Sequence, residues 1–175
     1  KYRSFLEKHK VAVFSSNYSL YGDMSQRVMN TLAEFTPAIE VYSIDEAFLD
    51  LSGFERTDLS AYCRRMCKET KRRTGIPVSV GVGKTKTLAK VANHIAKRNP
   101  ALKGAFVIDT VETRERCLKD LPVDEIWGIG RQYSRKLQKN GVRTALDFSN
   151  LPDRWVKEEM TIVRLNKKKE LEGEP

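Results

Sequence analysis

Two adjacent carboxylates, Asp45 and Glu46, stand at the centre of the apolar segment 41–51 and are the residues of this chain best suited to chemistry. Neighbouring ionised carboxylates repel each other, so they must stay hydrated or bind a cation. A pair of divalent metal ions that handles a phosphoryl group commonly requires this arrangement. Because consecutive strand residues point to opposite faces, the tip must be bent or bulged to aim both side chains at one site. A simple hairpin turn is the alternative, since aspartate is an ordinary turn residue.

A second candidate site is the segment Gly128-Ile129-Gly130-Arg131, which lies between two expected helices. Glycines lack Cβ atoms, so the backbone can come close to a phosphate, and the start of the next helix attracts that phosphate through its free N–H groups and dipole. Arg131 adds a positive charge. A valine at Gly130 should block the approach and tolerate a positive φ poorly. The pattern predicts a helix-hairpin-helix that binds the DNA backbone, with a plain turn as the alternative.

Cationic side chains recur along the helix that is expected around residues 86–97. One polar stripe beside its apolar face, at helical spacing, consists of Lys86, Lys90, Asn93 and Lys97. Lys84 lies just before this helix. The lysines are suited to phosphate contacts, and a solvated helix face is the alternative interpretation.

The composition favours a polyanionic partner. The 175 residues include 32 Lys and Arg against 23 Asp and Glu, a formal net charge of +9, which favours nucleic acid over a membrane surface. No stretch approaches the roughly 18 apolar residues of a membrane span, and the first residues do not read as a signal peptide. The three cysteines lack framework spacing, which is typical of the reducing cytoplasm. Cys63 and Cys67 are interpreted as packing residues of a helix.

The elements that must position these residues form an α+β pattern. Strands are expected at 11–14, 39–43, 47–51, 78–82 and 106–108, and helices at 21–35, 59–74 and 88–95. The first six elements run βαββαβ, the ferredoxin-like unit in which helices cover one face of an antiparallel sheet. After residue 109 the strand signals end, and a charged helix at 111–121 and a second one ending near Asn140 follow. We therefore expect one domain at 1–108 and a small all-helical domain at 109–175.

Taken together, these segments resemble the Y-family translesion DNA polymerases, most closely those of the UmuC type. Residues 42–46 are similar to the carboxylate motif of the family's palm domain, residues 80–97 to its second conserved stretch, and residues 121–130 to the thumb. The resemblance implies that Asp45 bridges two Mg²⁺ ions and that Glu46 holds the ion that activates the primer 3′-hydroxyl.

The resemblance also implies the remaining roles. The lysine that matches Lys97 contacts the incoming triphosphate, and the helix-hairpin-helix grips the duplex backbone. The intact protein would be a DNA-directed DNA polymerase of damage bypass, DNA repair and the SOS response. Its substrates would be primer-template DNA and a deoxynucleoside triphosphate. The reaction would be an in-line attack of a 3′-hydroxyl on an α-phosphate, assisted by two metal ions.

Several parts of the family have no counterpart in this sequence. These are a strand with another metal-binding aspartate, most of the fingers, and the little-finger domain that contacts the sliding clamp. We therefore expect an internal fragment, with residues 1–10 as the end of the fingers, that lacks polymerase activity by itself.

Two alternatives remain open at this point. One is a non-catalytic nucleic-acid-binding module with a ferredoxin-like domain, which would bind DNA equally with or without Mg²⁺. The other is a nucleotide cyclase-like enzyme, which shares a βαββαβ core with paired acidic metal ligands. A cyclase would need neither the glycine hairpin nor the basic surplus.

Overall fold

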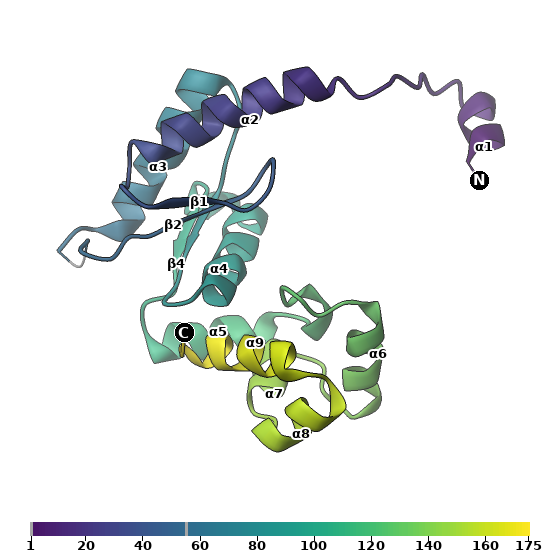
Figure 1. Cartoon of the computed structure of the whole chain (residues 1–175), viewed down its shortest axis with the longest axis vertical. Coiled ribbons are helices and arrows are strands. Elements are labelled where there is room, and N and C mark those ends of the chain that lie inside the picture. Colours follow the sequence, from purple (N-terminus) through teal and green to yellow (C-terminus); the bar gives the residue numbers. More distant parts are fainter. Residues whose placement is uncertain (1, 55) are drawn as a thin grey trace.

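The computed structural model describes residues 2–54 and 56–175, in which every strand precedes residue 108 and the later elements are helices (Figure 1). This arrangement confirms the α+β class. In chain order the elements are α1 (Arg3–Lys8), α2 (Tyr18–Ala33), β1 (Ile39–Val41), β2 (Ala47–Leu49), α3 (Leu59–Thr74), β3 (Val80–Val82), α4 (Lys86–Arg98), η1 (Pro100–Leu102), β4 (Ala105–Val107), α5 (Val111–Asp120), η2 (Val123–Glu125), α6 (Arg131–Lys139), α7 (Ala145–Ser149), α8 (Asp153–Glu159) and α9 (Ile162–Glu172). Among the described helices, none has the length and apolar character that crossing a membrane requires.

The four strands form two separate pairs. β1 and β2 are antiparallel, with Ile39 opposite Leu49. β3 and β4 are parallel, with Val80 opposite Ala105, whereas an antiparallel sheet was expected throughout. The difference follows from the connection, because a helical crossover through α4 returns the chain in the same direction, whereas a short hairpin reverses it.

The strand predicted at residues 11–14 is absent, and this prediction was wrong. The segment is irregular and leads away from the body of the molecule towards α1 (Figure 1). Val13 is 72% exposed and Phe14 is 86% exposed. A strand persists only when a neighbouring strand pairs with its N–H and C=O groups, and no strand of the described chain does so here. An apolar run indicates β propensity and gives no information about a partner.

Local signals define the helices that cover the strand pairs. The side chains of Asn17, Asp58 and Thr85 each accept a hydrogen bond from the third N–H that follows, at the starts of α2, α3 and α4. These caps satisfy donors that have no intrahelical partner. Gly75, with φ +77°, ends α3 in the left-handed conformation that glycine favours. The three predicted helices of this region are confirmed.

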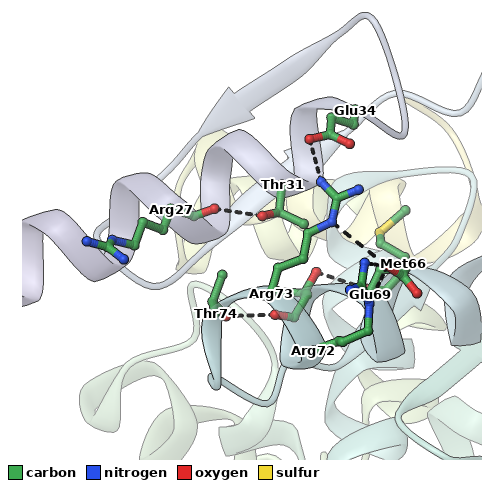
Figure 2. Close-up of polar contacts among 9 residues, drawn as sticks. Arg27, Thr31, Glu34, Met66, Glu69, Arg72, Arg73 and Thr74 are labelled. Carbon is green, nitrogen blue, oxygen red and sulfur yellow. Dashed lines mark hydrogen bonds and ion pairs between the residues drawn. The ribbon is translucent and has the colours of Figure 1, made fainter.

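Polar contacts join α2 to α3 (Figure 2). Arg73 Nη1 of α3 lies 2.6 Å from Glu34 Oε1 at the end of α2, and Arg73 Nε lies 3.8 Å from Glu69 Oε2 in its own helix. Exposed ion pairs of this kind each contribute little stability. The helices are held mainly by a buried cluster that packs against residues of β1 and β2 and comprises Val28, Met29, Leu32, Phe35 and Met66.

A second and larger core joins α4 to the helices that follow. The apolar face of α4 packs with residues of α5 to α9, and this core includes Leu88, Val91, Ala92, Leu118, Leu137, Phe148 and Leu171. Helix α4 therefore contacts the strands on one side and the helical part on the other. The apolar core is continuous across residue 109, where the sequence suggests a boundary.

The cysteines of α3 pack inside the protein. Cys63 is 0% exposed and Cys67 is 8% exposed, which confirms the interpretation of both as packing residues. Burial raises the pKa of the Cys63 thiol to about 11. The thiol is therefore protonated near neutral pH and is a poor nucleophile.

Candidate functional site

The two carboxylates singled out by the sequence lie at the loop between β1 and β2, which we call the acidic tip (residues 42–46). The chain bends at residues 43–45, and the N–H groups of Tyr42 and Ser43 both donate to the carbonyl oxygen of Glu46, each at 3.0 Å. Two residues on one side therefore face one on the other, as in a β-bulge. The expected distortion of the tip is present, with Asp45 exposed and Glu46 half-buried.

The two carboxylates have different partners. Asp45 Oδ1 accepts a hydrogen bond from Ser43 Oγ at 2.7 Å. Glu46 Oε1 lies 2.5 Å from the Nζ atom of Lys90 on α4. The ammonium group offsets part of the repulsion between the adjacent carboxylates.

The donor set is chemically suited to a magnesium ion, because carboxylate oxygens are the ligands that Mg²⁺ prefers. Within residues 2–54 and 56–175, however, no three side chains of His, Cys, Asp or Glu gather to form a metal site. Asp45 and Glu46 would need further ligands from water, from a substrate or from another part of the protein. A metal ion would also have to replace Lys90 at Glu46.

The structure separates the four lysines that the sequence groups as phosphate contacts. Lys86 Nζ binds Glu40 Oε2 at 2.6 Å, next to the ion pair of Lys90, so both lysines face the β1–β2 hairpin. Lys84 lies before α4 and Lys97 near its end, and both are exposed. Neither has an ion pair in the part of the chain that the structure describes. Lys84 and Lys97 are therefore available to a phosphate, whereas Lys86 and Lys90 are already engaged.

The second site is the glycine hairpin (residues 128–131), which leads into α6. Gly128 has φ +92°, whereas Gly130 has φ −81° and ψ 172°. The expectation of a positive φ at Gly130 was therefore wrong, because this residue is the N-cap of α6, a position that usually has an extended backbone. A Cβ atom added to Gly130 would meet nothing within 4 Å, so this side of the hairpin is open. Ile129, 6% exposed, anchors the hairpin in the larger core.

The N-terminus of α6 is suited to an anion. No side chain caps it in the described structure, and the first N–H groups of a helix lack intrahelical partners and carry the positive end of its dipole. Arg131, at the first position, is exposed and forms no ion pair with a described residue. Leu137 and Val142 are 0% and 5% exposed and hold the helix and its exit in the core.

An aromatic contact between the acidic tip and the glycine hairpin was not predicted from the sequence. The indole of Trp127, directly before Gly128, has its centroid 5.5 Å from the ring of Tyr42 and 5.6 Å from that of Phe48. Aromatic residues beside both candidate sites were a weak signal of this contact. Their meeting depends on the packing of distant segments, which residue spacing does not reveal.

Helix α9 connects the helical part of the chain (residues 109–175) to α4 through hydrogen bonds. Glu170 Oε2 accepts a hydrogen bond from the Thr87 N–H at 3.0 Å, and Glu170 Oε1 lies 2.8 Å from Lys167 Nζ. Burial alone would raise the pKa of the Glu170 carboxyl, but the hydrogen bonds from Lys167 and Thr87 outweigh it and lower this pKa below its usual value. Glu170 is therefore ionised at neutral pH, and its charge stabilises the contact between α9 and α4.

Two family models match this chain. The model described as "impB/mucB/samB family" matches residues 3–94, and the model described as "IMS family HHH motif" matches residues 112–142. The second match covers α5, the glycine hairpin and α6, which confirms the predicted helix-hairpin-helix motif.

Curated relatives are longer than this chain. Protein UmuC of Salmonella typhimurium (strain LT2) is 41% identical over 100% of this chain and 42% of that protein. DNA polymerase IV of Brucella melitensis biotype 1 is 37% identical over 75% of this chain and 29% of that protein. The chain spans less than half the length of these relatives.

Solved polymerase structures share the fold. An insertion ternary complex of Dbh DNA polymerase matches with a TM-score of 0.78 and 26% identity, over 98% of this chain and 50% of that chain. DinB from Sulfolobus solfataricus matches with a TM-score of 0.75 and 28% identity, over 96% of this chain and 49% of that chain.

Proposed function

The chain belongs to the impB/mucB/samB family, and we propose that it forms most of the palm and the thumb of a translesion DNA polymerase. The proposed palm covers residues 1–108, of which 1 and 55 lie outside the described part, and the proposed thumb covers residues 109–175. The observation that carries the proposal is the bent acidic tip, which holds the consecutive residues Asp45 and Glu46, in a chain whose relatives include proteins named as DNA polymerases.

In this proposal the tip binds Mg²⁺ with ligands that the described residues do not supply. Bound Mg²⁺ would activate the primer 3′-hydroxyl and stabilise the charge that develops on the phosphate. Lys90 keeps Glu46 paired until the ion binds. Lys97 contacts the triphosphate of the incoming nucleotide, and Lys84, which forms no ion pair with a described residue, adds positive charge just before α4.

The proposed thumb holds the duplex by its backbone. The open side of Gly130, the uncapped N-terminus of α6 and Arg131 support a contact with one phosphate group. Such a contact reads no base, so binding is independent of sequence. Contact with a sliding clamp would come from another part of the intact protein, and the reaction would take place in the cytoplasm.

Primer extension by the intact protein that contains this chain tests the proposal. Asp45→Asn should lower the rate about 100-fold or more, because a bound metal stabilises the transition state by several kcal/mol. Asp50→Asn is the matched control, since Asp50 is an exposed carboxylate of the same hairpin that binds Ser52 at 2.6 Å. Full activity of Asp45→Asn would contradict the proposal and favour a non-catalytic DNA-binding module.

A further inference from the structure

Residues of the proposed palm and thumb meet around the indole of Trp127. We call this cluster the Trp127 junction, and it consists of Tyr42, Phe48, Lys90, Trp127 and Lys167. The three rings contact one another, and Tyr42 and Phe48 are 5.8 Å apart between centroids. Tyr42 opens the acidic tip and Trp127 directly precedes the glycine hairpin. The junction therefore joins the two candidate sites through side chains in contact.

Lys90 links the carboxylate of the tip to this aromatic cluster. Its Nζ atom lies 2.5 Å from Glu46 Oε1, 5.6 Å from the Trp127 centroid and 5.7 Å from the Tyr42 centroid. These ring distances fall within the range of cation–π attraction. The Lys90 side chain is only 21% exposed, so water competes weakly for the ammonium group. One cation thus contacts both a proposed metal ligand and the residue that precedes the hairpin.

Lys167 of α9 contacts the same indole as Lys90 of α4. Its Nζ atom lies 3.9 Å from the Trp127 centroid, and its Cγ atom would lie 3.7 Å from a Cβ atom at Gly128. Lys167 is held in turn by Glu170, which binds Thr87 of α4. The position of the indole, and of Gly128 after it, therefore depends on contacts with α4 and α9 together.

We propose that Trp127 is a positioning residue that couples metal binding at the acidic tip to duplex binding at the glycine hairpin. The inference rests on the proposed function. Lys90 and a divalent ion would compete for the Glu46 carboxylate, because both are positive, so a bound ion would leave the Lys90 ammonium without this partner. Lys90 would then keep only its contacts with the rings of Tyr42 and Trp127, and the indole and the adjoining hairpin would follow its ammonium group into a position that favours duplex binding. Coupling between two sites is reciprocal and commonly amounts to 5-fold to 150-fold in affinity, and we expect about 5-fold here.

The test compares duplex affinity with and without Mg²⁺ at constant ionic strength. Mg²⁺ also screens DNA phosphates, but this effect is the same for every variant. Glu46→Gln therefore serves as the reference that retains screening and loses the metal ligand. We expect Mg²⁺ to favour duplex binding by the unmodified chain about 5-fold more than by Glu46→Gln. Trp127→Leu should show the same Mg²⁺ dependence as Glu46→Gln, and Trp127→Phe should retain part of the coupling.

Fluorescence supplies a readout that a purely structural role would not change. The chain has two tryptophans, and Trp155→Phe leaves Trp127 as the sole tryptophan while it keeps an aromatic ring packed against the larger core. We expect Mg²⁺ to change the Trp127 emission in this variant as Lys90 leaves Glu46. The change should vanish when Glu46→Gln is added to Trp155→Phe.

The possible outcomes separate the inference from the proposed function. If Trp127→Leu keeps the Mg²⁺ dependence of the unmodified chain, the coupling does not pass through Trp127 and the inference is overturned. Equal Mg²⁺ dependence of the unmodified chain and Glu46→Gln also overturns it. Neither result contradicts the proposed function, which the Asp45→Asn extension assay decides independently.

Discussion

The acidic tip and the glycine hairpin differ in how far the chain itself satisfies their charges. At the tip, Glu46 is bound to Lys90, and Asp45 accepts a hydrogen bond from Ser43. At the hairpin, the N-terminus of α6 has no side-chain cap and Arg131 forms no ion pair with a described residue. The hairpin can therefore receive an anion as it stands, whereas the tip must exchange a bound lysine for a metal ion and recruit further ligands.

The two regions also differ in packing. Ile129 anchors the hairpin in the larger core, which continues into α4, whereas Asp45 is exposed at the end of a short strand pair. Substitutions at the tip should alter chemistry and leave stability almost unchanged. Substitutions of the buried residues that support the hairpin should alter stability and duplex binding together.

The largest expected effect is on the stability of the protein when the core side chain of α6, the helix that follows the glycine hairpin, is shortened. Leu137 of α6 is 0% exposed, so Leu137→Ala should lower the free energy of unfolding by about 2–5 kcal/mol through lost burial and a cavity. Asp45→Ala should change it by no more than about 0.5 kcal/mol, as for other exposed sites. Chemical denaturation of both variants measures the difference. Equal destabilisation would mean that the tip is a structural turn.

The two glycines of the hairpin offer a matched pair of alanine substitutions. Gly128→Ala should cost about 1–2 kcal/mol of unfolding free energy because φ is +92° at this position. Gly130→Ala should cost less than about 0.5 kcal/mol, because its backbone is extended and the added Cβ atom meets open space. Gly130→Ala should nevertheless weaken duplex binding, since the methyl group stands where the phosphate approaches. Thermal unfolding and duplex titration of both variants check these expectations, and wild-type duplex affinity of Gly130→Ala would contradict the proposed contact.

A low pH should weaken the contact between α9 and α4. The pKa of Glu170 is lower in the folded protein than in the unfolded chain. Its contribution to stability is therefore present above the unfolded pKa and is lost as the pH falls through the folded pKa. We expect Glu170→Gln to remove about 1 kcal/mol at neutral pH and to flatten the acid limb of the stability profile. Unfolding curves at several pH values measure this, and an unchanged acid limb in Glu170→Gln would contradict it.

The smallest effect concerns the lysine at the tip. Lys90→Met keeps the apolar stem and removes the cation that competes for Glu46. Mg²⁺ affinity should rise by up to about 5-fold, in keeping with the 1 kcal/mol or less that a partly exposed ion pair contributes. Calorimetric titration with Mg²⁺ checks this, with Lys86→Met as the matched control because Lys86 pairs with Glu40 instead. A loss of Mg²⁺ affinity in Lys90→Met would show that the lysine assists the metal site.

The sequence predicted the elements whose signals are local. Apolar side chains at helical spacing predicted the three helices of the strand-containing part, and Gly128 and Gly130 predicted the hairpin before α6. The bend of the acidic tip followed from the need to hold two adjacent carboxylates.

Contacts between segments that are far apart in the chain could not be predicted from the sequence. The apolar run at residues 11–14 predicted a strand without a partner, and the split into two strand pairs was not foreseen. Helical spacing placed Lys86, Lys90 and Lys97 on one stripe but could not show that two of them bind hairpin carboxylates. The meeting of Tyr42 with Trp127 depends on how α4 joins the two parts, which no local pattern encodes.

The salt dependence of duplex binding by the 175-residue chain tests most directly whether the glycine hairpin binds a DNA phosphate. Log Kd should rise with log salt, and each phosphate neutralised by a side-chain cation contributes about 0.9 to the slope. Arg131→Ala should reduce this slope by about one. The matched control, Arg154→Ala, removes the same charge from α8, where Arg154 is 87% exposed and pairs with Glu158; it should keep the wild-type slope. Equal slopes for both variants and the unmodified chain would contradict the account, because the glycine hairpin would then be only a connection between helices.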